Sequence, residues 1–242
     1  MLFFKNPFVE KRHALGPIYL LFISFYFTGI LNSNLKSILT VFLILLVGFP
    51  LVSIITHNPE IRYNFMFSEI LNFDFNDLFL NTFVNTLHYD AFSNLMGAIK
   101  YYEVNNPIIG YQLLGSILFF VPRSYWIDKP LSSGEEVANF LMNKYSLWFN
   151  NLSQPLVGEG WINFGFIGVI FFAILFAYFV FYFSRWNENN DLLKKIFYVY
   201  FSYHLIFFLR GDLMNGIAYL IGPYLAIYIV PKILEKIIKV KE

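Results

Sequence analysis

Apolar residues in this chain gather in long stretches, and five of these approach the roughly 20 residues that a membrane-spanning helix needs. They cover about residues 14–31, 37–56, 161–183, 195–209 and 215–238. A further apolar run, Ile108–Val121, is shorter, so we expect it to be re-entrant or interfacial rather than spanning. The pattern predicts an all-α fold, a polytopic membrane helix bundle with about five spans.

The polar segment 57–160, between the second and third predicted spans, carries its apolar residues at helical spacing. Such spacing predicts amphipathic helices, which would lie on the membrane surface or over the mouth of the bundle. Ser133 followed by Glu136 has the form of a capping box and predicts a helix that begins there and continues to Phe149. The other periodic stretches run over residues 67–83 and 89–99. We therefore expect a long loop of amphipathic helices.

Charge is distributed unevenly and indicates the orientation of the chain. Segment 57–160 holds five Lys/Arg against ten Asp/Glu, whereas the rest of the chain holds twelve against six. Basic residues favour the cytoplasmic side, so the lysines after the fifth span place the tail in the cytoplasm. The sequence then divides into two N-terminal transmembrane helices (1–56), an external, periplasmic-side loop (57–160), and three C-terminal transmembrane helices with a cytoplasmic tail (161–242).

Composition narrows the class of protein. With 57% hydrophobic, 21% aromatic and 14% charged residues, the chain is outside the range of soluble globular domains. The formal net charge of +1 gives no reason to expect nucleic-acid binding, and the lack of cysteine excludes disulfides, thiolate metal sites and cysteine nucleophiles. The sequence holds no P-loop, no Gly-x-Gly-x-x-Gly, no paired-histidine zinc motif and no Asp-x-Asp. We expect neither a cofactor nor a bound metal.

Four basic residues stand out among those in the external segment or at the predicted outer edge of a span. Arginine presents a fixed fork of N–H donors that suits phosphate oxygens, and it stays charged. The same residues could instead anchor lipid headgroups or form salt bridges. The four are Arg62, Arg123, Lys129 and Arg210.

Acidic residues in the same regions could act as general bases or as partners for those cations. Glu159 has the strongest positional signal because it lies between two glycines just before the third predicted span. A solvated loop charge is the alternative for each acid. His204, within the fourth predicted span, could form an internal hydrogen bond or serve in proton transfer. The candidate acids are Asp90, Asp128, Glu159 and Asp212.

Two motifs resemble the signature of oligosaccharide repeat-unit polymerases, the Wzy-type O-antigen and capsule polymerases of bacterial inner membranes. The first is Pro122–Pro130 (PRSYWIDKP), and the second is Gly158–Gly168 (GEGWINFGFIG). Arg210-Gly211-Asp212, at the outer end of a late span, and Asp90–Leu95 (DAFSNL) fit the same family. The resemblance extends over about residues 62–229.

This resemblance implies a substrate and a reaction. The substrate would be a sugar repeat unit joined through a diphosphate to undecaprenol in the outer leaflet. The growing chain would move en bloc from its lipid diphosphate to a new lipid-linked unit. Arg123 and Arg210 would bind the diphosphate without a metal ion, assisted by Lys129 or Arg62.

The resemblance also implies catalytic acids and partners. The candidate catalytic residues are Glu159, Asp90 and Asp212, of which Glu159 or Asp90 would deprotonate the acceptor hydroxyl. A flippase that delivers the substrate and a chain-length regulator are the expected protein partners, and the lipid bilayer is the expected surroundings.

Two other functions stay open from the sequence. An O-antigen ligase-like glycosyltransferase shares the multi-span plan and the large external loop, and it uses the same chemistry on a different acceptor. A transporter, or a non-catalytic membrane protein of the same pathway, is the alternative from another class. Transport favours charges within the spans and an internal repeat, whereas ten of the sixteen acidic residues here lie in one external loop.

The predicted position of the N-terminus departs from the positive-inside rule, and the predicted number of spans departs from the family pattern. Counting spans back from the cytoplasmic tail puts Lys5, Lys11 and Arg12 outside, against the positive-inside tendency. Members of the family are also usually much longer, with more spans. Either Ile108–Val121 crosses the membrane after all, or spans that originally preceded this chain are missing. We expect the second, which makes this chain the carboxy-terminal portion of a longer polymerase.

Overall fold

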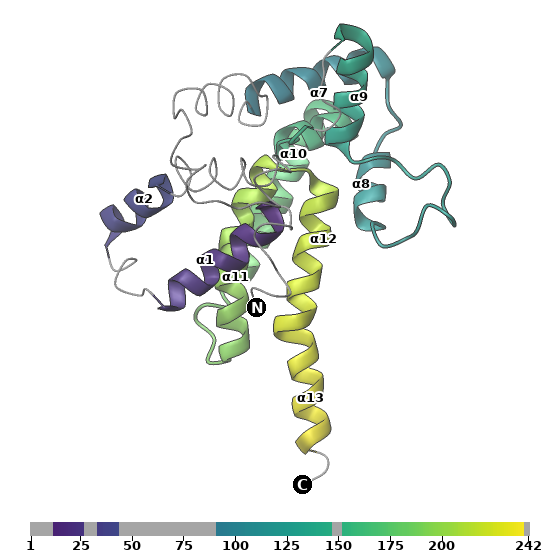
Figure 1. Ribbon diagram of the computed structural model, residues 1–242. Helices are drawn as coiled ribbons and strands as arrows, with labels where there is room; N and C mark the ends of the chain where they lie inside the picture. Colours follow the sequence, from purple (N-terminus) through teal and green to yellow (C-terminus); the bar gives the residue numbers. More distant parts are fainter. Residues whose placement is uncertain (1–11, 27–32, 44–90, 147–151, 240–242) are drawn as a thin grey trace, which may run out of the picture. The chain divides into compact units, whose positions relative to one another are not determined.

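The computed structural model describes residues 12–26, 33–43, 91–146 and 152–239, and these ranges contain helices and turns but no strand. The all-α prediction is therefore confirmed for the described residues (Figure 1). The chain divides into two compact units, Met1–Tyr89 and Asp90–Glu242.

The first unit holds two described helices, α1 (Arg12–Tyr26) and α2 (Asn34–Leu43). They coincide with the beginnings of the first two predicted spans, 14–31 and 37–56. The remainder of both spans lies outside the described residues, as does the periodic stretch 67–83. Two N-terminal spans therefore stay a prediction.

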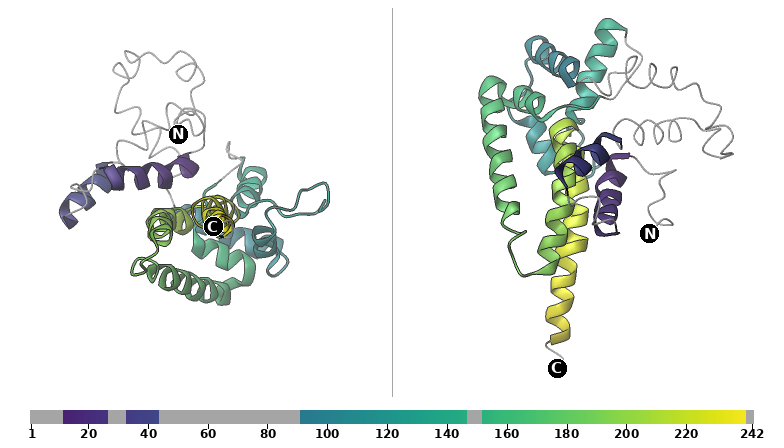
Figure 2. Two further views of the ribbon diagram at one scale, coloured as in Figure 1. Left: turned by 90° about the horizontal axis from the view of Figure 1, so that it is seen from below. Right: turned by 90° about the vertical axis from the view of Figure 1, so that its left-hand side faces the viewer.

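The second unit contains three helices that are long and apolar enough to cross a membrane, at 156–184, 192–210 and 213–238. They match the last three predicted spans. They are α10 (Leu156–Ser184), α11 (Leu192–Arg210), and a continuous rod of α12 (Leu213–Tyr224), η3 (Leu225–Ile229) and α13 (Val230–Lys239). Short turns at 185–191 and 211–212 make consecutive helices antiparallel neighbours (Figures 1 and 2).

Aromatic side chains join these helices at the end near the α10–α11 turn. Trp186, only 8% exposed, packs its ring against Phe183, Phe197 and Tyr228 at centroid distances of 5.1, 5.6 and 4.8 Å. Pro223 lies in α12 just before the wider π-helical turn of η3. Proline has no backbone N–H, so one helical hydrogen bond is missing at this position. A wider turn accommodates that change in the hydrogen-bond pattern.

Three shorter helices precede the long ones: α7 (Ala91–Asn105), α8 (Tyr111–Ile117) and α9 (Ser133–Tyr145). Helix α7 confirms the helical period predicted for 89–99 from residue 91 onward. Helix α8 has only seven residues, so the run 108–121 forms no spanning helix, as expected. Helix α7 packs on both α10 and α9.

The start of α9 corrects the predicted capping box. Ser132, not Ser133, is the N-cap, and its hydroxyl accepts a hydrogen bond from the Glu135 N–H at 3.4 Å. Glu136 turns away and accepts from the Tyr101 hydroxyl at 2.7 Å. The helix ends at Tyr145, earlier than predicted, where Ser146 adopts a left-handed conformation with φ of 57°. Ser133 is thereby free to point into the interior.

Helix α10 is broken near its beginning, within the motif Gly158–Gly168. Phe164 and Gly165 leave helical geometry, and Gly165, with φ of 61° and ψ of −144°, adopts a conformation suited to glycine. The two arms then approach so closely that a Cβ on Gly160 would lie 2.7 Å from the carbonyl oxygen of Gly168. The break separates the first two turns of α10, which carry Glu159, from the long apolar arm.

The close contact of the two arms predicts that Gly168→Ala destabilises the protein. The added methyl would overlap the carbonyl of Gly160, and overpacking of this kind costs about 1–3 kcal/mol. We expect a lower melting temperature in detergent, measured by intrinsic fluorescence. Gly222→Ala is the matched control, because its Cβ would meet nothing within 4 Å. Equal melting temperatures for the two variants would contradict this contact.

Candidate active site

Three helices bring their N-terminal ends together around one buried hydroxyl. Ser133 is the first residue of α9, Glu159 lies in the first turn of α10, and Asp212 is the N-cap of α12. The Ser133 hydroxyl is hydrogen-bonded to Oε1 of Glu159 and, at 3.1 Å, to Oδ2 of Asp212. The structure therefore unites two of the three predicted catalytic acids, Glu159 and Asp212, through a serine that sequence reasoning had assigned to capping. We call these three residues the carboxylate cluster.

Backbone N–H groups complete the surroundings of the carboxylate cluster. Gly134 donates to Oδ2 of Asp212 at 3.0 Å, and Leu213 donates to Oε1 of Glu159 at 2.8 Å. Asn215 donates to Oδ1 of Asp212 at 3.2 Å. These donors come from the first turns of α9 and α12, where the helix dipole favours negative charge. The cluster is thus a pair of carboxyl groups held by N–H and O–H donors.

Burial makes the carboxylate cluster chemically unusual. Glu159 is 1% exposed and Asp212 is 5% exposed. Oε2 of Glu159 has no hydrogen-bond partner within the part of the chain that the structure describes. The Ser133 hydroxyl has one proton and can donate to only one of the two carboxyl groups. A proton on the other carboxyl group would let that group donate to the serine oxygen, so that both contacts become hydrogen bonds.

A second buried polar side chain, missed by sequence reasoning, lies just before α10. Gln154 is fully buried, and neither its amide oxygen nor its nitrogen has a hydrogen-bond partner among the described residues. Gly158, the first glycine of the second motif, leaves room for this amide, because a Cβ there would overlap it. The signal in the sequence is the pair Gln154-Pro155, which lies shortly before Gly158-Glu159-Gly160.

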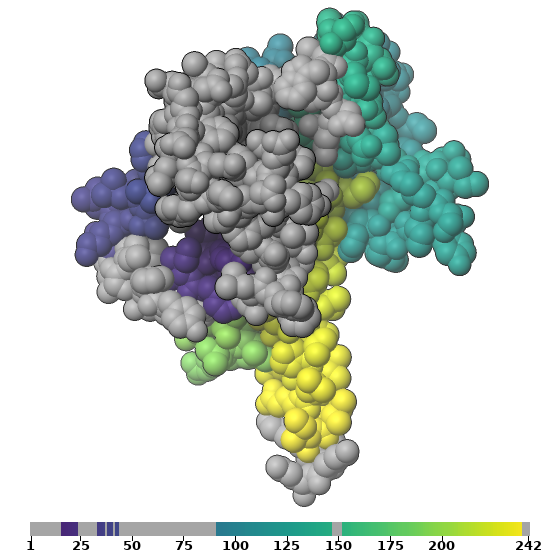
Figure 3. All heavy atoms as spheres, viewed as in Figure 1, coloured from purple at the N-terminus to yellow at the C-terminus, as the bar shows by residue number. Residues whose placement is uncertain are grey.

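The two basic residues of the first motif act within their own loop, which joins α8 to α9 and projects from the surface (Figures 1 and 3). Arg123 is exposed, and its two terminal nitrogens donate to the backbone carbonyls of Lys129 and Pro130. Lys129 is buried, and its ammonium donates to the carbonyls of Phe119 (2.6 Å) and Val121 (2.9 Å). Burial, and then the charge of Arg123, lower the pKa of Lys129. Each side chain braces the opposite end of the loop.

The remaining predicted site residues fall in different places. Arg210 ends α11, two residues before Asp212, and is partly exposed. Asp128 has an exposed side chain, and its backbone carbonyl accepts from the Tyr111 hydroxyl. Arg62 and Asp90 lie outside the described residues.

His204 lies in α11 and is fully buried. Its Nε2 forms a hydrogen bond with the carbonyl of Gly216 in α12, at 2.8 Å. The internal hydrogen bond that the sequence suggested is therefore confirmed.

A family model described as O-antigen polysaccharide polymerase Wzy matches residues 152–237. This match confirms the resemblance to Wzy-type polymerases for that part of the chain. It includes Glu159, Arg210 and Asp212, and it begins after α9 and Ser133. No curated protein and no solved structure gave a significant match.

Because Asp212 caps two helices, we predict that Asp212→Ala destabilises the protein more than the loss of an ordinary N-cap. The change would remove the α12 cap, worth about 1 kcal/mol. It would also leave the buried Gly134 N–H unpaired, which costs about 1–3 kcal/mol. The matched control is Asp191→Ala, the N-cap of α11, which accepts from the Leu193 N–H and pairs with Lys232. The melting temperature in detergent should fall further for Asp212→Ala than for Asp191→Ala. Equal decreases for the two variants would contradict the claim that Asp212 caps two helices.

The forked contact of Arg123 with two carbonyls predicts that Arg123→Lys behaves almost like Arg123→Ala. Lysine keeps the positive charge but cannot hold two adjacent carbonyls with a planar fork. At matched membrane levels, both variants should shorten surface polysaccharide to a similar degree on a gel ladder. Full function of Arg123→Lys would show that charge alone suffices at this position.

Proposed function

We propose that this chain polymerises oligosaccharide repeat units carried on undecaprenyl diphosphate, on the outer face of the bacterial inner membrane. The observation that supports this most is that the family match over 152–237 contains Glu159 and Asp212, which the fold brings to one buried hydroxyl. Three helices suited to membrane spanning lie in or overlap the same region. The product would be O-antigen, capsule or exopolysaccharide.

The proposed reaction is a glycosyl transfer. The bond between the anomeric carbon of the growing chain and its diphosphate oxygen breaks, and undecaprenyl diphosphate leaves with the bonding electron pair. A hydroxyl oxygen at the non-reducing end of the next lipid-linked unit forms the new bond to that carbon. The proton of this hydroxyl passes to a base on the protein, so atoms and charge balance.

Glu159 is the base that the geometry favours in this proposal. Its Oε1 is held by Ser133 and Leu213, while its buried Oε2 has no partner among the described residues and would take the acceptor proton. Ser133 and Asp212 are positioning residues, because they fix the carboxyl group without needing to touch the sugar. Asp90 keeps its place as the second predicted base.

Arginine side chains would stabilise the leaving diphosphate in place of a metal ion. Arg210 is close in sequence to Asp212 at the edge of the carboxylate cluster. Arg123 uses two of its five N–H donors on the loop, and the other three would bind phosphate oxygens. Lys129 supports this binding indirectly by bracing the same loop, and Arg62 stays a predicted ligand. A preorganised donor of this kind is worth roughly 10²–10³ in rate.

A flippase that delivers the lipid-linked unit and a chain-length regulator are the partners that this function requires. The flippase would supply substrate in the outer leaflet, and the regulator would set how many transfers precede release. Nothing in the proposed reaction involves nucleic acid.

The role of Glu159 predicts that Glu159→Gln abolishes polymerisation. The amide keeps the size of the side chain but cannot take the acceptor proton, so a deletion strain carrying this variant should make surface polysaccharide of one repeat unit. Glu188→Gln, the same change on the exposed α10–α11 turn, should restore the full gel ladder at matched membrane levels.

Two outcomes would contradict the proposal. A full ladder from Glu159→Gln would remove Glu159 as the base. Accumulation of long lipid-linked polymer in the deletion strain would indicate a ligase instead of a polymerase.

A further inference from the structure

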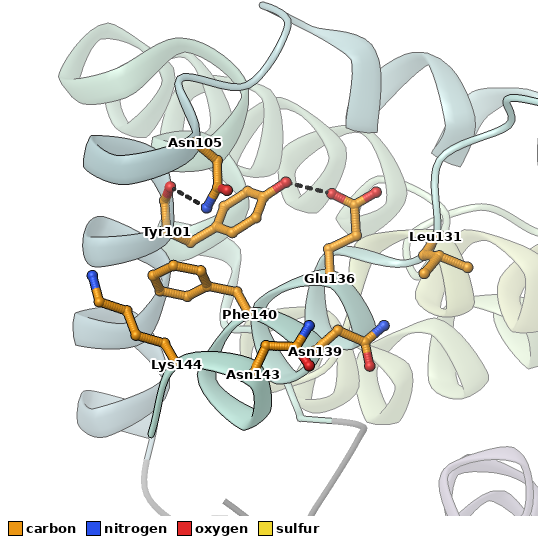
Figure 4. A pocket seen from close by; sticks show the side chains of 8 residues that line it. All are labelled: Tyr101, Asn105, Leu131, Glu136, Asn139, Phe140, Asn143 and Lys144. Carbon is orange, nitrogen blue, oxygen red and sulfur yellow. Dashed lines mark hydrogen bonds between the residues drawn. The ribbon is translucent and has the colours of Figure 1, made fainter. Parts of the chain in front are cut away.

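An open hollow of about 510 Å³ lies between α7 and α9 (Figure 4). Its size falls within the roughly 300–1,000 Å³ of small-molecule sites. Helix α9 supplies Glu136, Phe140 and Asn143, which share one face because they recur at helical spacing. The full lining is Tyr101, Asn105, Leu131, Glu136, Asn139, Phe140, Asn143 and Lys144.

A hydrogen bond across the hollow fixes its walls. The Tyr101 hydroxyl of α7 donates to Oε2 of Glu136 in α9 at 2.7 Å. The ring of Tyr101 meets the ring of Phe140 edge to face, with centroids 5.7 Å apart. Burial, and then the hydrogen bond to Glu136, raise the pKa of Tyr101, so its hydroxyl stays a donor. The hollow therefore has two rigid aromatic side chains and one oriented carboxyl group.

The chemistry of the lining suits a neutral, hydroxyl-rich ligand. Three amides, from Asn105, Asn139 and Asn143, line the hollow. Each amide both donates and accepts hydrogen bonds, as a sugar hydroxyl does. Tyr101 and Phe140 contribute apolar ring surface to the lining, and the Lys144 ammonium lies over the Phe140 ring, 5.3 Å from its centroid. Glu136 and Lys144 carry opposite charges that balance, and one ammonium without a guanidinium is a poor match for a diphosphate.

The hollow and the carboxylate cluster share helix α9. Ser133 lies one turn before Glu136 on α9, and the lining residues of α9 extend from there to Lys144. At 1.5 Å per residue, the lining thus begins about 5 Å and ends about 16 Å from Ser133 along the helix axis. An oligosaccharide lying along α9 would place one end near the beginning of the helix, where Ser133 lies.

From this lining and its place on α9, we propose that the hollow between α7 and α9 binds neutral sugar residues of the oligosaccharide substrate. Asn139 and Asn143 contact sugar hydroxyls. The assignment of these sugars to the polymerisation substrate rests on the proposed function, whereas the carbohydrate chemistry of the hollow does not.

The test is a direct binding titration with the full chain in lipid nanodiscs. The probe is the free oligosaccharide of one repeat unit, released by mild acid from the lipid-linked unit of the strain that carries the gene. Asn139→Ala with Asn143→Ala should weaken binding at least tenfold. The control is Asn190→Ala, an exposed asparagine on the α10–α11 turn. Alanine favours helix, so the double variant should keep its fold and melting temperature.

Saturable binding by wild type and the control, with the double variant weakened and excess inorganic pyrophosphate without effect, supports the proposal. No binding by wild type, equal binding by the double variant, or displacement by pyrophosphate overturns it. If the chain polymerises in cells without binding this probe, only the proposed sugar site in the hollow is wrong. If the chain binds the probe through Asn139 and Asn143 but does not polymerise, only the proposed function is wrong.

Discussion

The contact between two buried carboxyl groups and one serine is the constraint on which the second unit of this protein depends. Three helix ends carry N–H groups that have no partner within their own helices, and two acids satisfy donors from α9 and α12. The same hydrogen bonds that join α9, α10 and α12 also desolvate Glu159 and Asp212. A structural cap and a candidate catalytic site are therefore the same atoms, which ties activity to the integrity of the fold.

Features set by local composition could be predicted from the sequence. Hydropathy and length were sufficient to predict the three long apolar helices described in the second unit, and the predicted 195–209 falls within α11. In the sequence, the glycines around Glu159 indicated an important position. The structure shows why glycine is needed there. Gly158 makes room for the buried Gln154, while Gly160, Gly165 and Gly168 allow the break that sets the first turns of α10 apart.

Features set by distant contacts could not be predicted. Glu159 and Asp212 each meet Ser133 from 26 and 79 positions away, and no spacing rule gives such a contact. Ser132 and Ser133 are each followed three residues later by a glutamate, so the sequence alone left the capping serine ambiguous. Arg123 and Lys129 were expected to hold a diphosphate, yet both first satisfy carbonyl groups of their loop. Backbone groups in a folded loop need such partners as much as a ligand does.

We propose that the protein transfers a growing glycan between lipid diphosphates through its own side chains. The most direct measurement is reconstitution of the purified chain in liposomes with undecaprenyl-diphosphate-linked repeat unit as the sole substrate and a chelator present. Glycan length and released undecaprenyl diphosphate are followed together. We expect one undecaprenyl diphosphate to be released for each repeat unit added, and we expect lengthening to continue in the presence of the chelator. Lengthening that requires an added divalent metal, or no lengthening by folded protein, would contradict it.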